Sequence, residues 1–285
     1  MTTARMPAVV IEPRTGWVSL GLGELWQHRE LVGFLALRDV RVRYKQSLLG
    51  SAWALLQPLA TLAVFSGLFQ SLLGEQRLPS VPGVPYAVST FCALAPWQLF
   101  SRAVTAGGDS LVVNQAIVTK IYLPRLAVPL APVLASFVDF ALAFAVLVGM
   151  LCWFGIAPGP EAMLLPLLLV LTIAASLGTA LWLAAVNALY RDVRLALPFL
   201  LQLAMLVTPV VYDAASVLGS SPPWVRVVYA LNPMVGAVEG FRFALLGGAS
   251  LPWQMLAISS ASAIALLVSG LIVFRRLERV FADRV

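Results

Sequence analysis

The chain has 285 residues, of which 60% are hydrophobic and 11% charged, and its mean hydropathy is +0.91. This composition leaves too few polar groups to cover a soluble surface of that size, and no room for a large soluble ATPase or glycosyltransferase domain. The net charge of +6 would suggest nucleic acid in a soluble protein, but in a membrane protein it reflects topology, so we expect no nucleic-acid partner. Both cysteines, Cys92 and Cys152, lie in apolar runs, which favours packing thiols over disulfides or metal ligands.

Residues 1–50 are expected to form a cytoplasmic N-terminal region at the membrane surface. Tryptophan and leucine mix irregularly with charged residues there, a pattern typical of an interfacial helix. If residues 37–45 are helical, Arg38, Arg41 and Lys45 form one basic stripe at the depth of the lipid headgroups. The stripe suits a phosphate group, and it suits anchoring to anionic lipid equally well. The basic residues from Arg41 to Lys45 also alternate with period two, which leaves the helical assignment open.

Six intervals that are poor in charge follow residue 50, and each is long enough to cross a bilayer. They predict a transmembrane domain at 51–274 with six helices, at approximately 51–73, 86–106, 126–153, 162–189, 195–213 and 252–274. Breaks rich in proline and glycine separate several of them. The predicted fold class is therefore an all-α integral membrane protein.

The basic residues predict the orientation, because Lys and Arg are retained on the cytoplasmic side. With the N-terminus inside, all but three of the 19 Lys and Arg residues fall in cytoplasmic segments, and Arg77, Arg226 and Arg242 remain outside. Both termini, including a tail at 275–285, are expected in the cytoplasm. Some fifty residues precede the first apolar stretch without a small-residue cleavage site, so no removable signal peptide is expected.

The cytoplasmic loop at 107–125 is longer than a connection between two membrane helices needs. Its sequence from Leu111 to Asn114, followed by Ile117 to Lys120, predicts a short helix across the loop. Such a helix, with few charges, can fill a groove on a partner protein. A docking element is favoured over a passive connector.

The segment at 222–248 is apolar but too interrupted to cross the bilayer. Asn232 and Pro233 are expected to break a helix there, and Glu239 to pair with Arg242 one turn later. We expect a re-entrant or interfacial hairpin on the outer side, in which the ion pair is structural.

Asp139 is the one acid deep inside a predicted span. An intramembrane carboxylate is a functional candidate, and its suggested role is proton coupling, although one carboxylate makes no relay. Aromatic residues also gather in or near the first two spans, where they either stack on sugar rings in a channel or face lipid. The candidates for lining a channel are Trp53, Phe65, Phe69, Trp97 and Phe100.

Several segments resemble the ABC-2 type permeases that export polysaccharides. They are residues 38–50 (RDVRVRYKQSLLG), 53–58 (WALLQP), 96–100 (PWQLF), 118–125 (VTKIYLPR), 190–194 (YRDVR), 231–234 (LNPM) and 239–242 (EGFR). Each motif is weak alone, but in this order and at these separations they are specific and cover nearly the whole chain. The closest likeness is to permeases for O-antigen and capsule export.

The resemblance implies a homodimer of six-helix subunits bound to two copies of a separate ATPase subunit. The complex would move a polyprenyl-pyrophosphate-linked glycan outward across the bacterial inner membrane. No phosphate-binding loop of the P-loop pattern occurs in the sequence, so ATP and Mg²⁺ are expected on the partner and no cofactor on this chain.

The resemblance also implies roles for particular residues. An entrance at the lipid headgroups, in the gate-helix region, would receive pyrophosphate at Arg38, Arg41, Arg43, Tyr44 and Lys45. Contacts with the ATPase would lie at Asn114, Ile117, Lys120, Pro124 and Arg125, and again at Tyr190, Arg191 and Asp192. The hairpin, with Asn232, Pro233, Glu239 and Arg242, would match a re-entrant outer segment that shapes the exit.

Other functions stay open on the sequence alone. A secondary transporter would need several buried ionisable groups, and away from their ends the predicted spans hold only Asp139. A membrane enzyme would need clustered acids or histidines, whereas Glu75, Glu161, Asp213 and Glu239 are scattered. On the same fold, the cargo can also be a capsule polymer, teichoic acid, a lipid or a drug.

Overall fold

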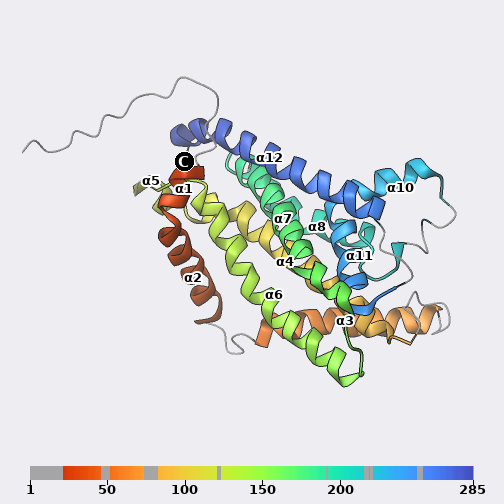
Figure 1. The fold of residues 1–285 in the computed structure, drawn as a ribbon. Coiled ribbons are helices and arrows are strands. Elements are labelled where there is room, and N and C mark those ends of the chain that lie inside the picture. Colours follow the sequence, from red (N-terminus) through yellow and green to blue (C-terminus); the bar gives the residue numbers. More distant parts are fainter. Residues whose placement is uncertain are drawn as a thin grey trace, which may run out of the picture.

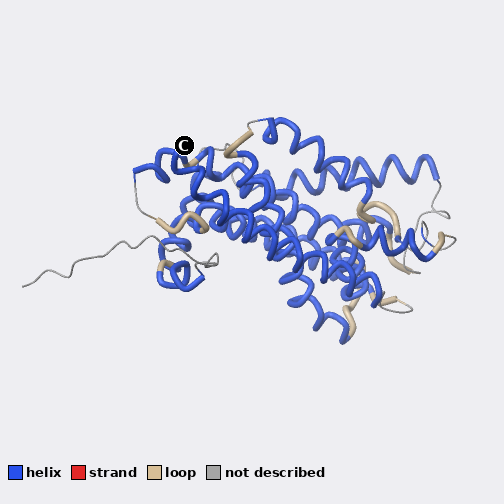
Figure 2. The backbone as a smooth tube through the Cα atoms, turned by 90° about the horizontal axis from the view of Figure 1, so that it is seen from above, coloured by secondary structure: helices blue, strands red, loops and turns tan. Residues whose placement is uncertain are grey.

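The computed structural model describes residues 22–45, 52–73, 83–120, 123–190, 192–214, 218, 221–248 and 253–284. These residues form helices and connecting turns, without a strand among them (Figure 2). The helices are α1 (Leu22–Gln27), α2 (Arg29–Lys45), α3 (Ala52–Leu73), α4 (Tyr86–Val113), α5 (Gln115–Lys120), α6 (Ala127–Trp153), the 3₁₀ helix η2 (Pro160–Leu164), α7 (Leu165–Asn187), α8 (Asp192–Val207), α10 (Pro223–Ala230), α11 (Pro233–Leu246) and α12 (Trp253–Arg284). The all-α fold class predicted from the sequence is confirmed.

Three stretches of described residues are long and apolar enough to cross a membrane: Ala127–Trp153, Pro160–Asn187 and Trp253–Glu278. They correspond to the third, fourth and sixth predicted spans, and the chain is a multi-pass membrane protein. Helices α3, α4 and α8 fall outside this set. Helix α8 has 16 residues and is therefore about 24 Å long, less than the ~30 Å hydrocarbon core. The assignment of six spans stays a prediction.

Several helix ends differ from the predicted boundaries. Helix α4 continues to Val113, past the predicted span end at 106, and the chain bends at Asn114 before α5 begins. The predicted short helix of the loop is thus only α5, because Leu111 belongs to the buried face of α4. Helix α12 continues to Arg284 and takes in most of the predicted tail. An ion pair of 2.7 Å between Arg275 Nη1 and Glu278 Oε2, one turn apart, supports this extension.

The main hydrophobic core lies between α4, α6, α7 and α11. Fully buried side chains from all four helices meet there, among them Phe91, Leu94, Leu147, Leu168 and Phe241. Phe140 and Phe241 pack edge to face with ring centroids 6.1 Å apart. Cys92 belongs to this core and is a packing thiol as predicted, whereas Cys152 is exposed, near the end of α6. The prediction for Cys152 was wrong because the residue lies on the outer side of its helix.

Helix α12 packs against α7 through two glycines, so that the two backbones approach closely. A Cβ at Gly178 would lie 2.5 Å from the backbone nitrogen of Leu267, and one at Gly270 would lie 2.6 Å from the Gly178 carbonyl oxygen. Trp182 Nε1 also donates to Ser269 Oγ across this crossing, at 3.0 Å. Small residues at the contact are typical of helix packing in membranes.

One end of the molecule gathers α1, α5 and the C-terminal end of α12 (Figure 1). A second hydrophobic cluster holds them to the helix bundle, with Val32 and Leu35 of α2, Leu126 and Val128 at the start of α6, and Phe274 of α12. Helix α2 lies beside α6 and is helical throughout Arg29–Lys45. The helical interpretation of residues 37–45 is therefore correct and the period-two alternative is wrong.

Candidate functional site

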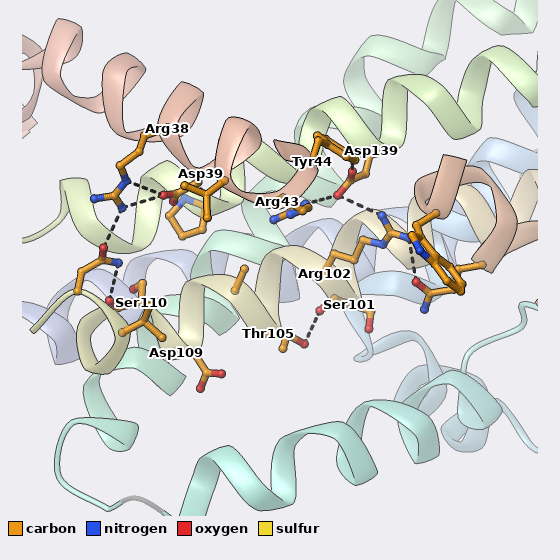
Figure 3. Close-up of a pocket in the computed structure, with 17 residues that line it drawn as sticks. Arg38, Asp39, Arg43, Tyr44, Ser101, Arg102, Thr105, Asp109, Ser110 and Asp139 are labelled. Carbon is orange, nitrogen blue, oxygen red and sulfur yellow. Dashed lines mark hydrogen bonds and ion pairs between the residues drawn. The ribbon is translucent and has the colours of Figure 1, made fainter. Parts of the chain in front are cut away.

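A polar cavity of about 940 Å³ lies between α2, α3, α4 and α6 (Figure 3). Each of the four helices contributes polar or charged side chains to its lining. These include Arg38, Asp39, Arg43 and Tyr44 from α2, Trp53 and Gln57 from α3, Ser101, Arg102, Thr105, Asp109 and Ser110 from α4, and Asp139 from α6. Asn114, at the bend after α4, also lines the cavity.

Asp139 is the centre of an ion-pair cluster in this cavity. The residue is 4% exposed. Arg43 Nη1 pairs with its Oδ2 atom, the Tyr44 hydroxyl donates to Oδ1, and Arg102 Nη1 lies 3.1 Å from Oδ2 (Figure 3). A buried carboxylate is stable when charged partners satisfy it, and here three donors do so from α2 and α4. These contacts explain why an acid is stable at this buried position, and the explanation does not need proton coupling.

Tyr44 holds its proton firmly in this position. Burial, and then the hydrogen bond to Asp139, raise the pKa of Tyr44 to about 12. The phenol is therefore a hydrogen-bond donor at neutral pH, and the carboxylate of Asp139 is its acceptor.

Arg38 fixes the middle of α2 to the bend between α4 and α5. Its Nη2 atom lies 2.7 Å from Asp39 Oδ1 and donates to Asn114 Oδ1 at 2.8 Å. The Asn114 side chain in turn donates to the Ser110 carbonyl oxygen at 3.0 Å. The cavity wall is thus bonded directly to the point where α5 begins.

Asp109 makes a second connection, from the cavity to the start of α8. Arg194 Nε lies 3.3 Å from Asp109 Oδ2, and Asn187 Nδ2 donates to Asp109 Oδ1 at 3.0 Å. These residues come from α8, α7 and α4, so one carboxylate joins three helices.

Sequence reasoning missed Arg102 and Asp109 as members of a site. The available signal was the spacing of Ser101, Thr105 and Asp109 at i, i+4 and i+8, which places a polar stripe on one face of an otherwise apolar helix. The structure turns this stripe toward the cavity.

The predicted entrance residues divide into two groups. Arg38, Arg43 and Tyr44 line the cavity, whereas Arg41 and Lys45 are exposed and lie outside its lining. The face of α2 that lines the cavity carries Arg38, Asp39, Val42 and Arg43. Arg38 and Val42 are four residues apart, and so are Asp39 and Arg43, so each pair lies on the same face of the helix. The predicted stripe of Arg38, Arg41 and Lys45 is therefore not the face that meets the cavity.

The predicted channel aromatics also divide. Trp53 is half-exposed and lines the cavity. Trp97 and Phe100 are buried in the core, where their ring centroids lie 5.5 Å apart, and Phe65 packs against the same core. The side chain of Phe69 lies outside the described residues. A channel role for these five residues stays a prediction.

The first predicted ATPase contact surrounds α5, and its residues face different directions. Lys120 is exposed, whereas Ile117 is half-buried against the cluster formed by α2 and α6. Pro124 is buried, and Arg125 donates through Nη1 to the Glu278 carbonyl oxygen of α12. The outer surface of α5 is formed by Lys120 with its exposed neighbours Gln115 and Ala116.

The second predicted contact lies between α7 and α8. Tyr190 is 66% exposed, Asp192 begins α8 and is exposed, and Arg191 lies outside the described residues. An acidic residue in the first turn of a helix is favoured by the helix dipole.

The segment at 222–248 contains two short helices, α10 and α11, separated at Asn232. The Asn232 side chain accepts a hydrogen bond from the Met234 amide at 3.0 Å and caps α11, which begins at Pro233. Glu239 and Arg242 form the predicted pair, with 2.7 Å between Oε1 and Nη1. Arg242 also donates to the carbonyl oxygens of Pro209, Val210 and Tyr212. Through these bonds, Arg242 fixes the backbone at residues 209–212, directly after α8, against α11.

Comparison with known proteins agrees with this architecture. The model of the ABC-2 type transporter family matches residues 30–246. The chain is 27% identical over 264 residues to the O-antigen export system permease protein RfbA of Myxococcus xanthus, covering 92% of this chain and 98% of that protein. It is 26% identical over 255 residues to RfbA of Klebsiella pneumoniae, covering 89% and 94%. It is 23% identical over 216 residues to the polysialic acid transport protein KpsM of Escherichia coli, covering 75% and 80%. The chain belongs to the ABC-2 type transporter membrane family.

Proposed function

We propose that this chain is the permease subunit of an ABC exporter for a polyprenyl-pyrophosphate-linked polysaccharide of the O-antigen type. The glycan would move outward across the bacterial inner membrane, driven by ATP hydrolysis on a separate subunit. The observation that carries the proposal is similarity along nearly the whole chain to permeases named for O-antigen export.

The polar cavity supports a substrate entrance. Its guanidinium groups, from Arg38, Arg43 and Arg102, suit the oxygens of a diphosphate. Trp53 and Gln57 offer an aromatic face and an amide, the groups that commonly bind sugar rings. A volume of about 940 Å³ is large enough for a diphosphate and its first sugars. Arg41 and Lys45, exposed on α2, would bind lipid headgroups beside the entrance.

The bonds from this cavity to α5 and α8 support a route to the ATPase. Arg38 bonds to Asn114 at the start of α5, and Asp109 pairs with Arg194 in the first turn of α8. We place the ATPase against the exposed residues of these two regions, Lys120, Tyr190 and Asp192. In this arrangement, two copies of the partner bind ATP and Mg²⁺, and this chain binds neither.

The proposal includes a topology with six spans, both termini in the cytoplasm and α10–α11 as a re-entrant outer hairpin. The helix break at Asn232 and the short lengths of α10 and α11 support the hairpin, because neither helix is long enough to cross the bilayer. A homodimer would supply the second half of the translocation path.

A second candidate is export of another cargo on the same fold. The similarity to the polysialic acid transport protein KpsM favours a capsule polymer among the alternatives. Transport coupled to protonation of Asp139 is not favoured, because Arg43 and Arg102 already pair with that acid.

The test is ATP hydrolysis by proteoliposomes that contain this chain and its ABC ATPase partner. A polyprenyl-pyrophosphate-linked glycan should stimulate hydrolysis, and the polyprenyl lipid without the glycan should not. Failure of any ATPase to co-purify, together with unchanged hydrolysis, would contradict the proposal.

A further inference from the structure

The arginines of the cavity already have anionic partners within the same lining. Among the described residues, its charged groups are three arginines and three aspartates: Arg38, Arg43, Arg102, Asp39, Asp109 and Asp139. A lining with equal numbers of both charges does not by itself attract a diphosphate strongly. An anionic ligand therefore competes with these carboxylates for the guanidinium groups.

The cluster around Asp139 has the geometry that best suits replacement of a carboxylate by a ligand anion. Arg43 and Arg102 both approach the same carboxylate oxygen, so two cations surround one anion and the group of three keeps a net positive charge. Tyr44 adds a neutral donor on the other oxygen. Two guanidiniums and a hydroxyl that converge on one acceptor also match the oxygens of a phosphate.

Arg102 also has a hydrogen-bond partner other than Asp139. Its Nη2 atom donates to Gln57 Oε1 of α3 at 3.0 Å. The Arg43 and Arg102 side chains remain 32% and 20% exposed and line the open cavity. Both cations are therefore accessible to a ligand that enters from the cavity.

We propose that Asp139 is a placeholder for the diphosphate of the cargo, and that Arg43 and Arg102 bind that diphosphate once it displaces the carboxylate. The proposal rests on the proposed function and assigns the diphosphate to Arg43 of α2 and Arg102 of α4. Because Arg43 and Tyr44 lie on α2 and Asp139 on α6, displacement breaks the polar tie between these two helices. Entry of the cargo then loosens the C-terminal end of α2 from α6, while the hydrophobic contacts of Val32 and Leu35 remain.

The experiment measures binding of farnesyl diphosphate to the full chain in lipid nanodiscs by titration calorimetry. Asp139→Asn removes the competing charge and should tighten binding about tenfold, and Arg102→Gln should weaken it about tenfold. The double variant Asp139→Asn with Arg102→Gln should bind farnesyl diphosphate more weakly than Asp139→Asn alone. Glu161→Gln, which removes one negative charge outside the cavity lining, should bind like the wild type.

Inorganic pyrophosphate and farnesol distinguish the source of the binding chemistry. Pyrophosphate should compete with farnesyl diphosphate and respond to the substitutions in the same direction, while farnesol should respond to none. Binding of farnesyl diphosphate that ignores both substitutions and resists competition by pyrophosphate would assign the affinity to the lipid chain and overturn the proposal.

Loss of Asp139 leaves two arginines without their anion, so folding is checked by size-exclusion profile and melting temperature. If Asp139→Asn does not fold, Arg102→Gln, which keeps the pair between Arg43 and Asp139, is tested alone and should still weaken binding about tenfold. A folded Asp139→Asn that binds no tighter than the wild type, or a folded Arg102→Gln that binds as tightly as the wild type, would overturn the proposal.

The two proposals fail separately. If the glycan stimulates ATP hydrolysis normally but substitution of Asp139 and Arg102 leaves diphosphate binding unchanged, only the placeholder role of Asp139 is refuted. Absent stimulation, combined with the expected shifts in diphosphate binding, removes the polysaccharide assignment and keeps the diphosphate site.

Discussion

The buried pair of Glu239 and Arg242 predicts a large loss of stability when one partner loses its charge. Glu239→Gln keeps the shape of the side chain but leaves the Arg242 cation, which is 8% exposed, with neutral carbonyl acceptors only. Removing one partner of a buried ion pair costs about 3–5 kcal/mol. Because Gln still accepts a hydrogen bond, we expect the lower end of this range, about 3 kcal/mol of unfolding free energy.

The assay is unfolding of the purified chain in mixed micelles, followed by circular dichroism as denaturing detergent is added. Asp109→Asn is the matched control, because its partner Arg194 is 55% exposed in its side chain and the pair measures 3.3 Å. Asp109 itself is 18% exposed, but its cationic partner is solvated, and pairs with solvated charges contribute about 1 kcal/mol or less. The double variant Glu239→Gln with Arg242→Gln should cost less than the sum of the two single changes. Equal losses for Glu239→Gln and Asp109→Asn would refute the reasoning.

Three further changes test the packing and the proposed coupling. Gly178→Ala should lower the unfolding free energy by about 1–3 kcal/mol, because the new Cβ would lie 2.5 Å from the α12 backbone. The control Gly149→Ala should cause no such loss, because a Cβ there meets nothing within 4 Å. Equal melting temperatures for the two variants would contradict the close crossing. Asn114→Ala removes the acceptor of Arg38 and should lower glycan stimulation of ATP hydrolysis several-fold while basal hydrolysis persists; unchanged stimulation would remove this link. Lys120→Glu should reduce co-purification of the ATPase without changing the melting temperature of the chain, and a normal yield would place the contact elsewhere.

Periodicity and the absence of charge predicted most of the helices. The apolar intervals at 126–153 and 252–274 locate α6 and the membrane part of α12 closely, because a charge inside the bilayer is costly. Helix ends were less predictable. Helix α4 continues beyond 106 because Gly107, Gly108 and Leu111 pack inside the protein, and this depends on neighbouring helices rather than on local sequence.

Local pairs were also predictable. Glu239 and Arg242 are three residues apart, so the helix itself brings their side chains together. The capping role of Asn232 follows from its position directly before Pro233.

The cavity was only partly predictable, because its contacts join distant parts of the chain. Asp139 was recognised as an unusual acid, yet its partners Arg43 and Arg102 lie on two other helices. The sequence pattern placed Arg102 only among the basic residues retained in the cytoplasm, which indicate the orientation of the chain in the membrane. Sequence spacing does not show which charges meet when helices pack side by side.

The direction of a side chain around a short helix was a further limit. Ile117 was predicted to contact the ATPase; α5 turns this half-buried residue toward α2 and α6, and its contact with the ATPase stays a prediction. Six residues give too few turns for an apolar face to be identified. The exposed side of α5, which carries Lys120, is the better place to test docking.

Transport itself is the most direct test of the central proposal. Inverted membrane vesicles with this chain and its ATPase would receive a radiolabelled polyprenyl-pyrophosphate-linked glycan on their outer, cytoplasmic face. The glycan should become protected from an added glycosidase when ATP is supplied, and remain accessible with a non-hydrolysable ATP analogue. A glycan that stays fully accessible with ATP, in vesicles whose ATPase is active, would contradict the account.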